Sequence, residues 1–242
     1  MNSSVYGFYD HISTDLFASL HYYFWWFQYA FTGLHNSPSL TPLFAAPFGS
    51  RMFFANFTGF VMAPVSALFG FLFSHNAVIL ANLVLSALGM FLLMRYLTKS
   101  ISAGIIAGIV FGFCPNLLVR SYTTFDSTQV QWIPFYTLFV IRFLEDRSWK
   151  NASLAGIFLL CNILFAMPYY LIYLPFHTLA LLGVYAVWLA RREESGVSAF
   201  VQDMLSARAL RSWLKAASVL TVVILVFAAY YVKWVGGTSS AT

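Results

Sequence analysis

The 242-residue chain combines 60% hydrophobic residues with only 9% charged residues, and its mean hydropathy is +0.76. A soluble domain carries roughly 25% charged residues, so this chain has too few of them to cover a water-exposed surface. The net charge of +5 is not gathered into a basic run or a nucleic-acid-binding motif, which excludes nucleic acid as the expected partner. The composition therefore predicts an integral membrane protein.

The N-terminal part differs from the rest of the chain. Residues 1–50 contain no Lys or Arg, and residues 16–31 are densely aromatic. Such a stretch predicts a helix lying in the headgroup layer of a membrane. The next apolar stretch, 53–73, is long enough to cross but is interrupted by Pro64 and Gly70. Whether it crosses decides the side of residues 1–50, and their lack of basic residues favours the outer side.

Six further stretches have the ~20 mostly apolar residues that a transmembrane helix requires. Ten of the 13 Lys and Arg residues cluster around the turns after the first, third and fifth stretches. The positive-inside rule therefore places these turns in the cytoplasm, and the loop 120–127 and the C-terminus outside. The predicted spans are 77–96, 102–119, 128–144, 152–170, 173–190 and 214–234.

These stretches predict an all-α fold, a polytopic membrane helix bundle of about six transmembrane helices. Amphipathic juxtamembrane helices are expected in the first outer loop. The parts would be an outer loop over 1–75, a five-helix core over 76–190, a cytoplasmic connection over 191–213, and a sixth helix with an outer C-terminus over 214–242.

The eight acidic residues divide between the two predicted sides of the membrane. Five lie in predicted cytoplasmic loops, and the others are Asp10, Asp15 and Asp126. If residues 1–50 are outside, these three carboxylates share the outer face, and in a chain so poor in charge they indicate a site. Asp15 and Asp126 each precede a predicted helix, so helix capping is the competing interpretation of both.

No other catalytic motif competes with these carboxylates. The chain has no GxGxxG, P-loop, nucleophile elbow, HExxH or CxxC motif. A divalent metal held by Asp15 with His21 or His35 is one alternative. The simpler interpretation is that these histidines are isolated polar side chains at the membrane interface.

Several features occur in a recognisable order along the chain. Asp15 is followed by HYYFWWFQYAFTG, the broken stretch 53–73, the basic turn FLLMRYLTKS and the small-residue span AGIIAGIVFGFCPN, and then by LLVRSYTTFDSTQ with Arg120 and Asp126. This order resembles the N-terminal half of the GT-C superfamily of polytopic glycosyltransferases, over about residues 10–190. It favours a juxtamembrane position for 53–73. Family members have a span before the first acidic loop and continue further, so we expect this sequence to be a fragment of a longer chain.

The resemblance implies a glycosyltransferase of the bacterial inner (plasma) membrane, with a polyprenyl-phosphate-linked sugar and membrane lipid as partners. Transfer would occur at the outer face with inversion. Asp15 would be the general base, within ~3 Å of the acceptor proton, and Asp126 would orient the acceptor, hold a metal or tune the first carboxylate. Arg120, and next Arg51, would bind the donor phosphate. Interfacial anchoring is the competing role for Arg120.

Two other classes of function remain open. A membrane transporter or flippase would place polar groups inside its spans, where Asn82 and Asn162 are the strongly polar candidates. A non-catalytic membrane assembly subunit would need no pair of outer carboxylates.

Overall fold

The fold is almost entirely helical, as predicted. The computed structural model of the chain describes residues 26, 29, 40–41, 50–51, 57–123, 128–165, 168–192 and 207–234. Within these ranges, β1 (Leu40–Thr41) and β2 (Ser50–Arg51) form one short antiparallel pair, with Leu40 opposite Arg51. The prediction of an all-α fold is confirmed.

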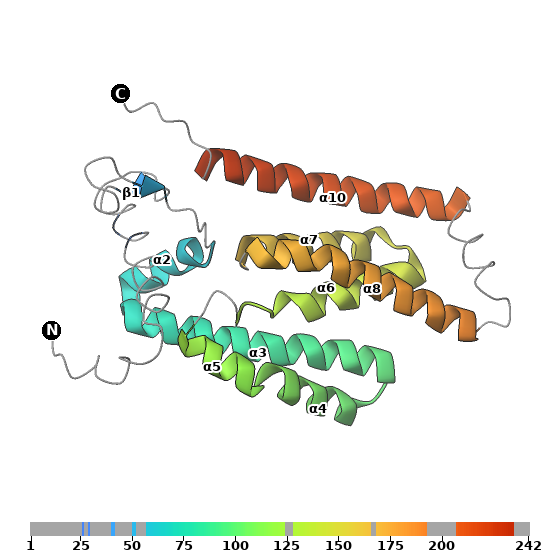
Figure 1. Cartoon of the computed structure of the whole chain (residues 1–242), viewed down its shortest axis with the longest axis horizontal. Coiled ribbons are helices and arrows are strands. Elements are labelled where there is room, and N and C mark those ends of the chain that lie inside the picture. The colour runs from blue at the N-terminus through green and yellow to red at the C-terminus, as the bar shows by residue number, and fades with distance from the viewer. Residues whose placement is uncertain are drawn as a thin grey trace.

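The helices run back and forth as antiparallel rods (Figure 1). Helix α3 packs against α4 and α6, α6 packs against α7, and α7 packs against α10. In chain order the described helices are α2 (Phe57–Phe69), α3 (Phe71–Thr98), α4 (Ile101–Gly112), α5 (Pro115–Thr123), α6 (Trp132–Asp146), α7 (Trp149–Phe165), α8 (Pro168–Arg192) and α10 (Ala207–Trp234).

Two of the described helical segments are long and apolar enough to cross a membrane. They are Phe71–Thr98 and the combined α4 and α5 over Ile101–Ser121. Trp149–Phe165, Ile172–Val187 and Ala217–Val226 are apolar but shorter. Length and composition therefore support a membrane protein through two segments, and the six spans stay a prediction.

The interrupted stretch 53–73 contains a short helix and a sharp turn. Helix α2 has 13 residues with Pro64 inside it, which gives a length of about 20 Å at 1.5 Å per residue. The hydrocarbon layer is ~30 Å thick, so α2 alone is too short to cross it. Gly70 separates α2 from α3 and has a φ of +82°, a value that glycine adopts without the clash a Cβ would cause.

Helices α3 and α4 approach closely because α4 presents a row of glycines. Gly104, Gly108 and Gly112 are buried and lie four residues apart on one face of α4. A Cβ at Gly108 would lie 2.7 Å from the carbonyl oxygen of Ala87, and one at Gly112 would lie 2.5 Å from the Ala87 Cβ. Small residues at this spacing let helix backbones pack together inside membranes.

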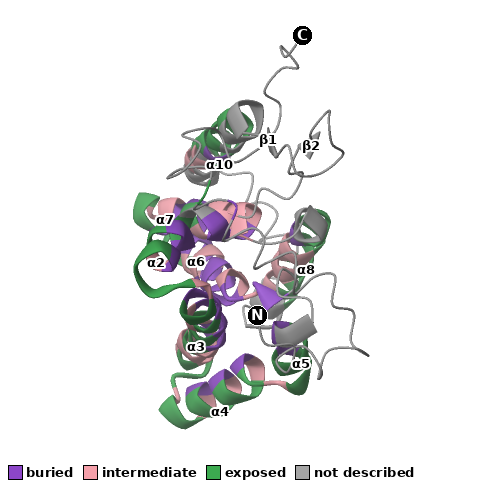
Figure 2. Cartoon of the chain, turned by 90° about the vertical axis from the view of Figure 1, so that its left-hand side faces the viewer, coloured by how far each residue is buried: buried purple, intermediate pink, exposed green. Residues whose placement is uncertain are grey.

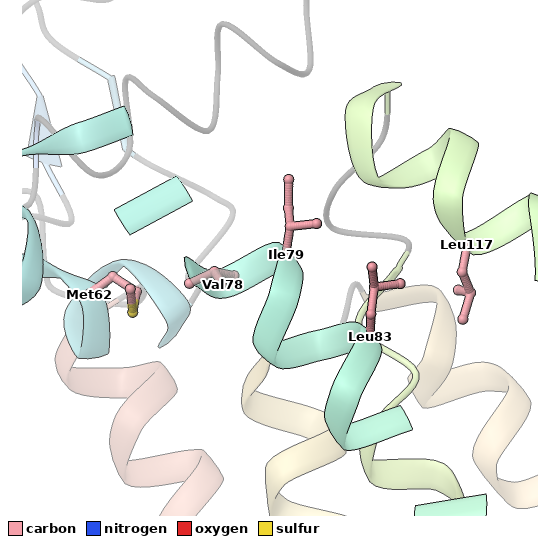
Figure 3. Packing of buried hydrophobic residues seen from close by; sticks show 5 residues of the cluster. All are labelled: Met62, Val78, Ile79, Leu83 and Leu117. Atoms are coloured by element: carbon pink, nitrogen blue, oxygen red, sulfur yellow. The ribbon is translucent and has the colours of Figure 1, made fainter. Parts of the chain in front are cut away.

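Apolar side chains fill the interior and also cover much of the outside. One core cluster joins α2, α3 and α5 (Figure 3). Buried residues gather where α3, α6 and α7 face one another, whereas the face of α4 that is turned away from α3 is exposed (Figure 2). That face carries large apolar side chains, including Ile106 and Val110, which are 64% and 65% exposed. Apolar surface of this kind marks contact with lipid or with another protein.

Two ends of the bundle are distinguished by their charges. The turn between α3 and α4 and the turn between α6 and α7 lie at the same end (Figure 1). We call this the basic end, because it carries Arg95, Lys99, Arg142, Arg147 and Lys150. The opposite end, where α2 meets the start of α3 and where α5 leads into α6, is called the outer end after its predicted position.

Candidate functional site at the outer end

Most of the predicted site residues lie outside the described part of the chain. These are Asp15 and Asp126, with the metal candidates His21 and His35. The pairing of the two carboxylates in one site therefore stays a prediction. For Arg51 the structure gives the backbone, as the second residue of β2, opposite Leu40.

Arg120 lies on the exposed face of α5, at the outer end of the bundle. Its Nε donates a hydrogen bond to Oδ1 of Asn116, one turn earlier, at 2.9 Å. A guanidinium has five N–H donors in a planar fork, and this bond occupies one of them. The bond orients the guanidinium along the α5 surface. In the sequence Arg120 comes six residues before Asp126.

A group of buried polar side chains lies at the start of α6, shortly after residues 124–127 in the sequence. Thr128, Gln129 and Gln131 directly precede α6 and are 2%, 1% and 2% exposed. Thr58 of α2 is also buried, and its hydroxyl exchanges hydrogen bonds with the Gln129 side chain: Gln129 Nε2 lies 3.0 Å from Thr58 Oγ1. We call Thr58, Thr128, Gln129 and Gln131 the polar junction. It ties α2 to the start of α6.

Two buried polar atoms at or beside this junction, Gln131 Oε1 and Trp132 Nε1, have no hydrogen-bond partner among the described residues. Burying a polar group without a partner costs roughly 1–3 kcal/mol. Gln131 and Trp132 therefore carry this cost at the start of α6.

Aromatic rings of α2, α6 and α7 pack against one another next to the polar junction. The Trp132 ring centroid lies 6.1 Å from that of Phe158 and 5.6 Å from that of Phe165, both on α7. Phe57 of α2 packs edge-on against Phe165 with a centroid distance of 5.2 Å. Donor and acceptor groups beside aromatic rings suit a ligand with both hydroxyl groups and apolar faces.

A second set of polar contacts joins α6 to α8. Tyr136 Oη lies 2.9 Å from Thr178 Oγ1, and Thr137 Oγ1 lies 2.9 Å from His177 Nε2. Both contacts join side chains that are 40 residues or more apart in the sequence, so they connect α6 to α8.

The polar junction was missed in the sequence, because its residues fell inside or beside apolar windows. The available signal was STQVQW, where two glutamines stand next to a tryptophan at the start of the predicted span 128–144. The structure starts α6 only at Trp132. Residues 128–131 therefore do not belong to the helix, and the predicted start of this span was wrong by four residues.

Within the described ranges, no group of three or more His, Cys, Asp and Glu side chains could hold a metal ion. Comparison of the chain with protein-family models, with curated proteins and with solved structures finds no match. The resemblance to GT-C glycosyltransferases therefore stays a prediction, carried by the order of features in the sequence.

Proposed function

We propose that the chain is a membrane-embedded glycosyltransferase that moves a sugar from a polyprenyl-phosphate-linked donor to an acceptor, with inversion. The membrane is the bacterial inner membrane, and transfer takes place at its outer face. The observation that carries the proposal is the polar junction. It buries Gln129 and Gln131 at the end of the bundle that also carries Arg120. In the sequence Asp126 lies between them, six residues after Arg120 and three before Gln129.

The proposed bundle crosses the membrane six times, through α3, α4 with α5, α6, α7, α8 and α10. The antiparallel arrangement of these rods and their exposed apolar faces support six crossings (Figure 1). The basic end is cytoplasmic under the positive-inside rule. The polar junction and Arg120 are then outside, on the side where a lipid-linked sugar donor would present its sugar to the acceptor.

The proposed reaction is a single displacement at the anomeric carbon. The acceptor oxygen forms the new bond to this carbon, and its proton passes to the Asp15 carboxylate as general base. The bond from the anomeric carbon to the phosphate oxygen breaks, and polyprenyl phosphate leaves with the electron pair. Arg120 stabilises the negative charge that develops on this phosphate, because its guanidinium can bind two phosphate oxygens.

The polar junction gives the proposed enzyme its sugar-binding groups. Gln131 Oε1 can accept a hydrogen bond from a sugar hydroxyl, and Trp132 Nε1 can donate one. Asp126, three residues before Gln129 in the sequence, orients the acceptor. A single displacement needs no nucleophilic serine or cysteine, and Cys114 and Cys161 have no place in it.

The proposal is tested with the variants Asp15→Asn and Asp126→Asn. Membranes containing each variant are assayed for transfer of labelled sugar from a panel of polyprenyl-phosphate sugars, with abundance measured by immunoblot. Both variants should lose transfer while abundance stays the same. An amide at position 15 cannot take the acceptor proton, and an amide at position 126 lacks the charged carboxylate that orients the acceptor. Full transfer by both variants would contradict the proposed roles of Asp15 and Asp126 in sugar transfer.

A transporter or flippase is the second candidate, and one observation favours it. Asn82 and Ser86 lie one turn apart near the middle of α3, and Asn82 Nδ2 and Ser86 Oγ are buried without a hydrogen-bond partner among the described residues. Polar groups in the interior of a transmembrane bundle often mark a transport path. Substrate movement that survives Asp15→Asn and Asp126→Asn but is lost in Asn82→Leu would favour this class.

A further inference from the structure

A cavity of about 490 Å³ opens between α3, α6 and α7 toward the basic end of the bundle. Three cationic side chains line it: Arg95 and Lys99 from α3 and Arg142 from α6. None of the described residues that line it is acidic. The cavity therefore carries three positive charges at the end of the bundle that we place in the cytoplasm.

Two of the three cations lie over one aromatic ring, and the third, Arg95, lies over Phe91 with its Cζ 6.0 Å from the ring centroid. Lys99 Nζ lies 4.2 Å from the centroid of the Tyr96 ring, and Arg142 Cζ lies 4.6 Å from the same centroid. A cation over an aromatic face is held by the ring quadrupole, which leaves its N–H donors able to bind an anion. Tyr96 thus brings positive charges from two helices to one place.

The acidic groups nearest to this cavity are already engaged. Glu145 and Asp146 line an adjoining cavity together with Lys150. The Tyr96 hydroxyl donates to Glu145, and Asp146 accepts from the Ser148 backbone N–H at 2.9 Å and from Asn151 Nδ2 at 2.6 Å. The two cavities together hold four cationic and two acidic side chains, so the region keeps a net charge of +2.

The inner part of the cavity is apolar. Phe135 and Phe139 of α6 stack on Phe158 of α7, with centroid distances of 5.0 and 5.5 Å and interplanar angles of 13° and 7°. Phe135 and Arg142 lie seven residues apart on one face of α6, which corresponds to about 10 Å along the helix. The lining therefore changes from stacked rings to cations along its length. A ligand that fits has a negative head and an apolar chain.

We propose that this cavity binds an anionic membrane phospholipid. The phosphate lies between Arg95, Lys99 and Arg142, and an acyl chain lies along the phenylalanine wall. Clusters of basic residues at the cytoplasmic end of transmembrane helices attract anionic lipid headgroups. The cations of this site lie at the opposite end of the bundle from the polar junction, although Phe158 contacts Trp132 beside that junction as well as Phe135 and Phe139 here. The test of this site therefore measures lipid retention and not sugar transfer.

The test measures lipid retention by the full chain, purified in a neutral detergent, with native mass spectrometry. Phosphatidylglycerol, phosphatidylcholine and inorganic phosphate are titrated separately. The test variant carries Arg95→Gln and Arg142→Gln; Lys99 is kept because its φ of +57° ends α3. Removing two cations should weaken phosphatidylglycerol binding on the order of tenfold. Lys215→Gln, a basic residue of α10 outside the lining, should leave binding unchanged.

A second variant, Leu154→Trp, keeps every charge but fills the space next to Phe158, because Leu154 lines both cavities. It should also lower phosphatidylglycerol retention, whether or not the double variant folds. Equal retention of phosphatidylcholine and phosphatidylglycerol by the original chain would overturn the proposal. A loss of phosphatidylglycerol binding in Lys215→Gln as large as that in the double variant would also overturn it. Inorganic phosphate that displaces phosphatidylglycerol at millimolar concentration would show an anion site and would overturn the assignment to a lipid.

Discussion

Gly156 of α7 lies directly against Val219 of α10, so closely that a Cβ at Gly156 would collide with the Val219 Cγ1 atom. Helix α10 packs on α7 over this contact. A cavity of about 350 Å³ with a mostly apolar lining adjoins it and includes Trp149, Ile157 and Val222. The attachment of α10 to the bundle therefore depends on the absence of a side chain at one position of α7.

The first prediction follows from this contact. Gly156→Ala should destabilise the chain by roughly 1–3 kcal/mol, because overpacking forces helices or side chains out of place. Val219→Ala in the same chain should restore most of the loss by removing the colliding methyl group. The measurement is the thermal unfolding midpoint of the purified chain in detergent.

Gly183→Ala is the matched control for this prediction. Gly183 lies in α8, and a Cβ there would meet no heavy atom of the described structure within 4 Å. This substitution should not lower the unfolding midpoint. An equal decrease for Gly156→Ala and Gly183→Ala, or no rescue by Val219→Ala, would contradict the close contact of α7 and α10.

The second prediction concerns the hydrogen bonds between Thr58 and Gln129. Thr58→Val alone removes the hydroxyl that the buried Gln129 amide contacts, and Gln129→Leu alone removes the amide that the buried Thr58 hydroxyl contacts. Each should cost roughly 1–3 kcal/mol, whereas the double variant should cost less than the sum, because both polar groups are gone.

This double-mutant cycle is measured by chemical or thermal unfolding in detergent. Thr221→Val provides a control, because Thr221 is exposed on α10 and its hydroxyl bonds only to the Ala217 carbonyl of its own helix in the contacts described. Strictly additive effects of Thr58→Val and Gln129→Leu would show that the two side chains do not interact, and the polar junction would then not join α2 to α6.

Hydrophobic windows predicted the helices well, but they did not predict where some of them begin or end. The predicted span 102–119 is interrupted between Gly112 and Pro115, and the predicted span 152–170 ends at Phe165 before Pro168. In both cases a proline begins the next helix, where its missing N–H leaves no hydrogen bond unmade. A window average of hydropathy does not detect the start of a new helix, since one proline lowers the average only slightly.

The candidate site was harder to predict than the helices, for a different physical reason. Asp15, Asp126 and Arg120 stood out because charges are rare in this chain. Gln129 and Gln131 did not, because an uncharged amide next to a tryptophan lowers the hydropathy of a window without interrupting it. Both are buried, and Gln129 also contacts Thr58, which is 71 residues away in the sequence. Only a three-dimensional arrangement reveals that pairing.

The third prediction concerns which loops lie on which side of the membrane. Asp15 and Asp126 can form one site only if residues 1–50 and the loop 120–127 lie on the same side. Single cysteines are introduced at Ser37, Ser127, Ser100 and Ser148 after Cys114→Ser and Cys161→Ser, and intact cells are treated with a membrane-impermeant thiol reagent. Ser37 and Ser127 should be labelled from outside, because residues 1–50 carry no basic residue and 120–127 follows the second span.

Ser100 and Ser148 should be labelled only after the cells are opened. They lie in the two turns of the basic end, where Lys99 and Arg147 end α3 and α6 with left-handed φ values of 57° and 54°. Moving these cationic turns to the outer face would reverse the positive-inside bias of ten basic residues. Labelling of Ser37 and Ser127 from opposite sides would place Asp15 and Asp126 on different faces, and two carboxylates separated by a bilayer cannot act on one acceptor.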